Sequence, residues 1–438
     1  MSGWTALLTG ELAARAEHVV IGIARELRVL EPRAGESDFR RACLATGSAG
    51  QAVFFHQLAL TLGSEEERAA AEVRAEELLE DSVEALTSVP MGPSLFQGFP
   101  GIAWAAEHLR GEDEEDRGQE IDALLLDRVA VAPWPATLDL VDGLAGIAVY
   151  AAERLPSSAA AAILESLAAR LREAAEPVAE GLTWRFRAVP GWESPPQYDL
   201  GLAHGISGVV GALALLHGTV RERGRPAVAE MLDGAVSWLL AQEVAAHDTA
   251  EASRFPGMIH AVRPADPSGS GGPAAPSRLA WCYGDLAVAV ALDAAARARG
   301  DDGWRQRSID IAAQAALRSL ESSKVRDSGL CHGAFGVAHL FNRLYQSTGD
   351  PRLREGALRW FREGFALERP GEAIAGFPAW RVGRATAEAA WVPDTSLLTG
   401  AAGTALALLA AISTVEPAWD RILMASFAAP SLTFPAST

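Results

Sequence analysis

The chain has few cysteines, three in 438 residues. A small odd number in a long chain does not form the disulfide framework of a secreted protein. Reduced thiols that remain available as metal ligands are typical of the cytoplasm. We therefore expect a cytoplasmic protein whose cysteines are free.

The chain also lacks an excess of positive charge, because 38 Lys and Arg face 56 Asp and Glu and give a formal net charge of −18. Duplex nucleic acid and anionic membranes would be repelled. No stretch reaches the ~18 uninterrupted apolar residues of a membrane span. The start, Met1-Ser2-Gly3-Trp4, lacks the basic segment of a secretory signal. We expect no nucleic-acid partner.

Runs of alternating β-branched residues are scarce, whereas Ala, Leu, Glu and Arg, which favour helices, are frequent. A hydrophobic content of 49% is ample for a core. Ser64 and Glu67 form a capping-box pattern that opens a helix through about Leu86. Further amphipathic stretches predict outer helices at 4–30, 156–180, 224–243, 303–320 and 351–366. These features predict an all-α fold in one domain over residues 1–438.

A Gly-x-x-Gly step followed by an apolar run recurs along residues 40–412. Self-similarity at this period indicates a repeat architecture in which each unit buries its apolar face against its neighbours. One copy departs from the pattern, because Ala287 stands where the second glycine is expected. The first glycines are Gly47, Gly98, Gly143, Gly205, Gly284, Gly333 and Gly400.

Two repeat glycines are directly preceded by metal-ligand side chains, in Trp281-Cys282-Tyr283-Gly284 and Cys331-His332-Gly333. Two thiolates and one imidazole without a fourth protein ligand suit a catalytic zinc site. Neighbours such as Cys331 and His332 point about 100° apart in mid-helix, so a shared ion requires a loop-to-helix junction. The alternative is that Cys331 is a buried small side chain and His332 caps a helix.

These segments, with Leu202-Ala203-His204-Gly205 and Ser396-Leu397-Leu398-Thr399-Gly400, resemble the lanthionine synthetase C-like (LanC) cyclases in order and spacing. The resemblance implies an α/α toroid with about seven inner and seven outer helices. It also implies one zinc ion per chain, held by Cys282, Cys331 and His332.

The resemblance further implies four catalytic candidates, namely His204, Asp139, Arg278 and Tyr283. His204 is the expected acid or base, and its place before a helix suggests that its pKa is lowered and the ring neutral. Asp139 would orient or charge-balance His204, although Asp142 lies nearer Gly143 and could be the helix cap instead.

Arg278 could stabilise an enolate oxygen, and Tyr283 could donate a hydrogen bond or a proton. Their alternatives are a surface ion pair for Arg278 and wall packing for Tyr283 and Trp281. Residues 111–118 are expected to form a solvated turn. Residues 244–280, rich in Gly, Ser and Pro, are expected to form a long loop that serves as a lid or a substrate-contacting rim; the alternative is a flexible connection without such a role.

The resemblance implies a zinc-dependent lantibiotic-type cyclase that adds peptide cysteine thiols to dehydroalanine or dehydrobutyrine. Its implied partners are a dehydrated precursor peptide, a separate dehydratase and an export transporter, and a complex with these could bring the cytoplasmic chain to a membrane. A LanC-like enzyme that adds glutathione or another free thiol is the alternative. An α/α-toroid glycosidase with Asp139 and Asp142 as its carboxylates, or a non-catalytic peptide-binding scaffold, would leave the Cys and His residues without a role.

Overall fold

The computed structural model describes residues 3–30, 37–110, 116, 118–185, 197–244, 252–260, 276–382 and 388–426. The chain divides into two compact units. The first unit consists of two segments, the residues before Glu115 and Ser319–Asp420. The second unit consists of Glu115–Arg318 and the residues from Arg421 onward. The expectation of a single domain over residues 1–438 stays a prediction. Parts of the expected turn at 111–118 and of the loop at 244–280 lie outside the described residues.

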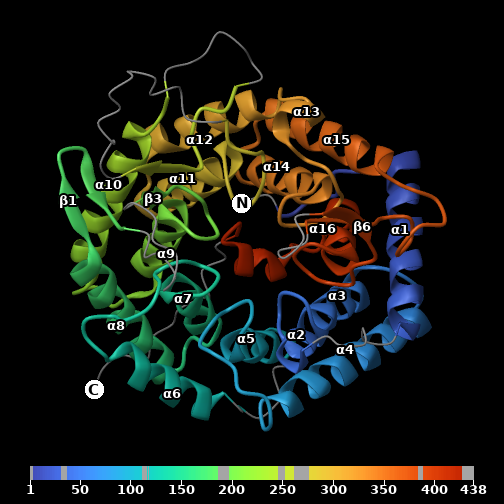
Figure 1. The fold of residues 1–438 in the computed structure, drawn as a ribbon, viewed down its shortest axis with the longest axis horizontal. Helices are drawn as coiled ribbons and strands as arrows, with labels where there is room; N and C mark the ends of the chain where they lie inside the picture. Colours follow the sequence, from blue (N-terminus) through green and yellow to red (C-terminus); the bar gives the residue numbers. More distant parts are fainter. Residues whose placement is uncertain are drawn as a thin grey trace. The chain divides into compact units, whose positions relative to one another are not determined.

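In the first unit, three helices that follow repeat glycines pack side by side, with α16 between α3 and α14, while α5 packs against the other side of α3 (Figure 1). The long amphipathic helices α1, α4 and α15 pack against α16, α3 and α14, respectively. The unit contains α1 (Gly10–Val29), α2 (Asp38–Ala42), α3 (Ser48–Thr61), α4 (Glu65–Ala85), α5 (Phe99–Leu109), α13 (Leu320–Ser323), α14 (Ala334–Thr348), α15 (Pro351–Ala366) and α16 (Ala401–Ile412).

In the second unit, α9 packs between α7 and α11, and amphipathic helices again form the other layer (Figure 1). There α8 packs on α7, α10 on α9, and α12 on α11. The unit contains α6 (Gln119–Val129), α7 (Leu144–Glu153), α8 (Ser158–Ala174), α9 (Ile206–Thr219), α10 (Arg225–Ala241), α11 (Asp285–Arg299) and α12 (Asp302–Ala315). A 3₁₀ helix, Ala418–Leu423, runs from the first unit into the second.

The two layers follow from composition. The helices after the glycines are mostly apolar, and each residue of α16 from Ala401 to Ala411 is buried. A helix that is hydrophobic all round has neighbours all round. The outer helices keep a polar face, and α4 opens with the expected capping box between Ser64 and Glu67. Among the described outer helices, α6 alone was not among the amphipathic stretches that the sequence predicted to be helical.

In the described part of the chain, three short antiparallel strand pairs interrupt the helices, and the sequence pattern did not predict them. β1 (Glu176–Val178) pairs with β2 (Gly181–Thr183). β3 (Gln197–Asp199) pairs with β4 (Met258–His260). β5 (Ala379–Val382) pairs with β6 (Ala389–Val392). They lie in connections and leave the helical layers unbroken.

All seven first glycines are the N-cap residues of the inner helices. The second glycine allows the preceding turn to approach the helix closely, since a Cβ on Gly336 would lie 1.8 Å from the Leu330 carbonyl oxygen. The copy before α11 has no second glycine, and its N-cap glycine has a different backbone conformation. Gly284 has φ +94°, outside the range of the other N-caps, and Ala287 is fully buried there. Only a glycine readily adopts that backbone conformation.

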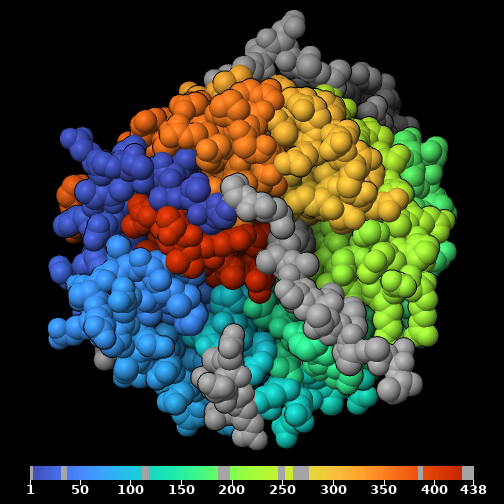
Figure 2. Space-filling model, turned by 180° about the vertical axis from the view of Figure 1, so that it is seen from behind, coloured from blue at the N-terminus to red at the C-terminus, as the bar shows by residue number. Residues whose placement is uncertain are grey.

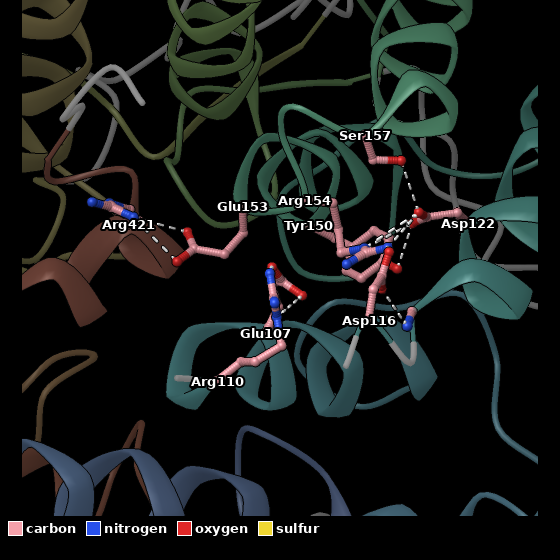
Figure 3. A network of polar contacts seen from close by, with 10 residues as sticks. Glu107, Arg110, Asp116, Asp122, Tyr150, Glu153, Arg154, Ser157 and Arg421 are labelled. Carbon is pink, nitrogen blue, oxygen red and sulfur yellow. Dashed lines mark hydrogen bonds and ion pairs between the residues drawn. The ribbon is translucent and has the colours of Figure 1, made fainter. Parts of the chain in front are cut away.

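The buried Asp122 carboxylate ties the second unit together (Figure 3). It accepts hydrogen bonds from the Tyr150 hydroxyl at 2.7 Å and from the Ser157 hydroxyl at 3.2 Å. The Arg154 guanidinium binds Asp122 at 2.8 Å and also lies 2.8 Å from Asp116. Because an unpaired buried charge is costly, these contacts fix how α6, α7 and α8 meet.

The N-terminal segment is fastened to α16 within the first unit. The Leu7 and Leu8 backbone N–H groups donate to the Ala411 carbonyl oxygen, and the Trp4 indole donates to that of Ala410. Figure 2 shows the N-terminal residues beside the C-terminal part of this unit. Among the described helices, none is both long and apolar enough to cross a membrane.

Candidate active site and metal ligands

The candidate residues lie in the turns that precede the inner helices. In three of these turns an aspartate six residues before the N-cap glycine accepts a backbone N–H two residues ahead of itself. Asp199 accepts from Gly201 at 2.7 Å, Asp327 from Gly329 at 3.3 Å, and Asp394 from Ser396 at 2.9 Å. This local bond closes the turn and sets where the following side chains point.

Cys331 and His332 lie in the turn before α14, so the predicted loop-to-helix junction is confirmed. Both side chains are half-buried. The Cys331 backbone N–H donates to the Leu398 carbonyl oxygen at 2.6 Å, which fixes this turn against the one before α16. Two adjacent residues with non-helical backbone can direct both ligand atoms to one side.

Cys282 occupies the corresponding turn before α11 in the second unit and is buried. Its carbonyl oxygen accepts the Leu202 and Ala203 N–H groups at 3.0 and 3.4 Å. Gly201 makes this approach possible, because a Cβ there would lie 2.6 Å from the Cys282 carbonyl oxygen. The turns before α9 and α11 are therefore held together by backbone contacts.

Asp139, Asp142 and His204, all in the second unit, form a group of described side chains that could hold a metal ion. The expected zinc ligands are divided between the units, with Cys282 in the second and Cys331 and His332 in the first. Neither Cys282 nor Cys331 forms a disulfide. Two thiols and an imidazole are a donor set that suits zinc and leaves a fourth position for substrate. The residues present therefore fit the expected ion.

His204 and Asp139 face one another within the second unit. The His204 Nδ1 atom lies 3.3 Å from Asp139 Oδ2. Asp139 is buried, and its other oxygen accepts the Asp142 N–H at 2.6 Å. The turn thus holds the carboxylate in place, and the carboxylate orients the ring so that Nε2 is the nitrogen left for a reacting group.

The expected low pKa of His204 is not what the structure gives. Burial opposes the charged ring, yet the hydrogen bond and charge of Asp139, with the charges of Asp199 and Asp142, outweigh it and raise the pKa. The helix N-terminus was expected to dominate, but three carboxylates gather around the ring. His204 therefore holds its proton to a higher pH than an ordinary histidine.

Tyr283 contacts a residue that the sequence analysis did not select. Its hydroxyl donates to Asp199 Oδ2 at 2.7 Å. Burial and the nearby Asp199 charge raise the pKa of Tyr283, and burial raises that of Asp199. The recurrence of Asp six residues before Gly205, Gly333 and Gly400 was the available signal for Asp199.

The remaining candidates separate by exposure. The Arg278 side chain is exposed, and Trp281 is buried with its indole N–H donating to the Leu423 carbonyl oxygen at 2.9 Å. Trp281 therefore packs the wall, as expected. Asp142 is exposed, and Gly143 rather than Asp142 is the helix N-cap. The competing role of Asp142 as the cap is thus wrong.

Three other residues of metal-ligand type contact groups that give them a structural role instead. Cys43 is buried and free, with its sulfur 3.2 Å from the Thr46 hydroxyl oxygen. His339 is fully buried, and its Nε2 lies 2.9 Å from Asp420 Oδ2. Burial and the neighbouring His108 lower the pKa of His56 to about 4.

Comparison with known proteins agrees with this architecture. The family model described as "Lanthionine synthetase C-like protein" matches residues 38–424. The solved structure of "Nisin cyclase" is similar with a TM-score of 0.68 at 17% sequence identity, over 95% of this chain and 98% of that one. This likeness shows the predicted fold class, an all-α toroid. No curated protein sequence matches the chain.

Proposed function

The chain belongs to the lanthionine synthetase C-like family, and from this premise we propose that it is a zinc-dependent cyclase that forms lanthionine and methyllanthionine rings. Family membership supports lanthionine-cyclase-type activity. The observation that carries the proposal lies within the second unit, where the turn that holds His204, beside Asp139, is hydrogen-bonded to the backbone of Cys282, one of the three expected zinc ligands. A thiol and an acid–base group are what the addition of a thiol to an alkene needs.

Cys282, Cys331 and His332 would hold the zinc ion. When bound, zinc lowers the pKa of a thiol in its open position and so favours the thiolate at neutral pH. Three protein donors would leave one position for a substrate sulfur, and neither Cys282 nor Cys331 forms a disulfide.

His204 supplies the proton handling. As the peptide sulfur bonds to the β-carbon of a dehydroalanine or dehydrobutyrine, the alkene electron pair moves to the α-carbon and its carbonyl group as an enolate. His204 Nε2 delivers a proton to that α-carbon, and the proton lost from the thiol restores the ring. The raised pKa of His204 favours the charged, proton-donating form of the ring. Asp139 holds Nδ1 and balances the charge. No atom is gained or lost overall.

We assign Arg278 to the developing enolate, and its exposed side chain just before the Cys282 turn supports this role. An arginine there would stabilise negative charge on oxygen. The substrate is a precursor peptide already dehydrated by a separate enzyme, and the product passes to an export transporter. We place the reaction in the cytoplasm, with any membrane association made through that biosynthetic complex.

Addition of glutathione or another free thiol is the second candidate, since the same donor set and acid would serve an external sulfur. One incubation separates the two. A dehydrated peptide with its own cysteines is treated with zinc-loaded enzyme, with and without glutathione, and then alkylated. A cyclase protects the cysteines from alkylation at unchanged peptide mass and without ATP. If every cysteine stays alkylatable and the mass rises by one glutathione, the transferase replaces the cyclase.

A further inference from the structure

Asp199 makes a hydrogen bond that its turn does not need. It ends β3, is buried, and closes its turn by accepting the Gly201 N–H through Oδ1. Its second oxygen accepts the Tyr283 hydroxyl at 2.7 Å. Oδ1 of Asp199 therefore closes the turn, and Oδ2 binds Tyr283, one of the candidate site residues.

The equivalent aspartates use their second oxygen differently. Asp327 Oδ2 accepts the Trp380 backbone N–H at 3.0 Å, and Asp394 Oδ2 pairs with the Arg381 guanidinium. Both contacts fasten the β5–β6 hairpin to a turn. Among these three turns, the one before α9 alone directs its aspartate at a side chain beside a metal-ligand candidate.

The direction of this bond decides what Tyr283 can offer a substrate. A phenol has one proton, and here the proton points at Asp199. Only lone pairs of the hydroxyl oxygen then remain for other partners. Tyr283 is therefore set to accept a hydrogen bond, whereas the sequence suggested that it donates one.

We propose that Asp199 is a positioning residue that turns the Tyr283 hydroxyl into a hydrogen-bond acceptor for the peptide substrate and leaves His204 as the proton donor of the site. The inference rests on the proposed cyclase function. It assigns the two residues separate roles, with Tyr283 holding the substrate and His204 exchanging the proton.

The substitution Asp199→Asn tests this directly. The Gly201 N–H requires the amide oxygen, so the amide nitrogen faces Tyr283 and donates to it. The Tyr283 proton is then turned outward in a nearly unchanged structure. We expect kcat to fall about 10- to 100-fold, the scale of a misplaced group in a reaction site. In a Tyr283→Phe background the same substitution should change kcat by less than about threefold.

Asp394→Asn is the matched control. It removes a charge from a buried aspartate in the same turn position, but its second partner is Arg381. We expect it to lower thermal stability while kcat stays within about twofold of the wild type. An Asp199→Asn enzyme with wild-type kcat, or losses from Asp199→Asn and Tyr283→Phe that multiply, overturns the positioning role.

Histidine NMR provides a readout that does not need activity. Asp139 and Asp142 from the turn before α7, and Asp199 from β3, place their charges near His204. Asp199→Asn should lower the His204 pKa, with the resonance identified by its loss in His204→Ala. An unchanged titration contradicts the inference. If the wild type forms no rings on dehydrated peptides but this titration shifts, the cyclase proposal fails while the placement of Asp199 stands.

Discussion

Replacement of Asp122 by alanine should destabilise the protein by about 3 kcal/mol. The Asp122 and Arg154 side chains are only 2% and 3% exposed and lie 2.8 Å apart. Removing one partner of a buried ion pair costs roughly 3–5 kcal/mol, because the other charge stays buried. Asp116 remains 2.8 Å from the guanidinium, and its side chain is 37% exposed. This second partner places the expected loss at the lower end of the range.

The measurement is urea unfolding at fixed zinc concentration, followed by circular dichroism. Adding Arg154→Met to Asp122→Ala should recover part of the stability, since no buried charge is then left unpaired. Glu77→Ala is the control, because the Arg74–Glu77 pair is largely exposed, with side chains 26% and 55% accessible. That change should cost less than about 1 kcal/mol.

The reasoning fails if Asp122→Ala loses less than about 1 kcal/mol, or if the double variant is no more stable than the single one. The first result would mean that water or Asp116 satisfies the guanidinium fully. The second would mean that the lost Tyr150 and Ser157 hydrogen bonds, rather than the unpaired charge, carry the effect.

The other predictions concern the site. The purified protein should contain about one zinc per chain. Metal analysis should show that the zinc is lost when any of the three expected ligands is changed to alanine and kept in Cys43→Ala. Zinc retention in all three ligand variants would refute the assignment. His204→Ala should slow ring formation on the order of 10²–10⁴-fold with zinc retained, and a loss below about threefold would leave His204 a structural role. Because the folded pKa of His204 is raised, its stabilisation is fully present below about pH 6.5 and is lost as pH rises through the folded pKa. Asp139→Asn should thus lower the melting temperature more at pH 6 than at pH 9, and an equal loss contradicts the pairing. Gly201→Ala should reduce zinc affinity, since its Cβ would meet the Cys282 carbonyl oxygen. Unchanged zinc affinity would show that the turns before α9 and α11 can separate without effect on the metal site.

The repeat and the ligand types could be predicted from sequence because they depend on local rules. A Cβ on any of the seven N-cap glycines would lie 1.9–2.4 Å from a backbone atom of the preceding turn, so glycine is required there and the N-caps recur at recognisable positions. Uniformly apolar and amphipathic runs likewise separate inner from outer helices. The short strand pairs were missed because three- or four-residue strands have too few positions to show an alternation.

The charge of His204 and the partner of Tyr283 depended on tertiary structure. Asp139 and His204 lie in different turns, far apart in the chain, and so do Asp199 and Tyr283. Local sequence indicated a helix N-terminus beside His204, which argued for a low pKa, but it contained no information on which carboxylates fold against the ring. Electrostatic effects depend on distance in space and on burial. The residue types of the site are therefore set by the sequence, while their protonation and hydrogen-bond direction are set by the contacts between turns.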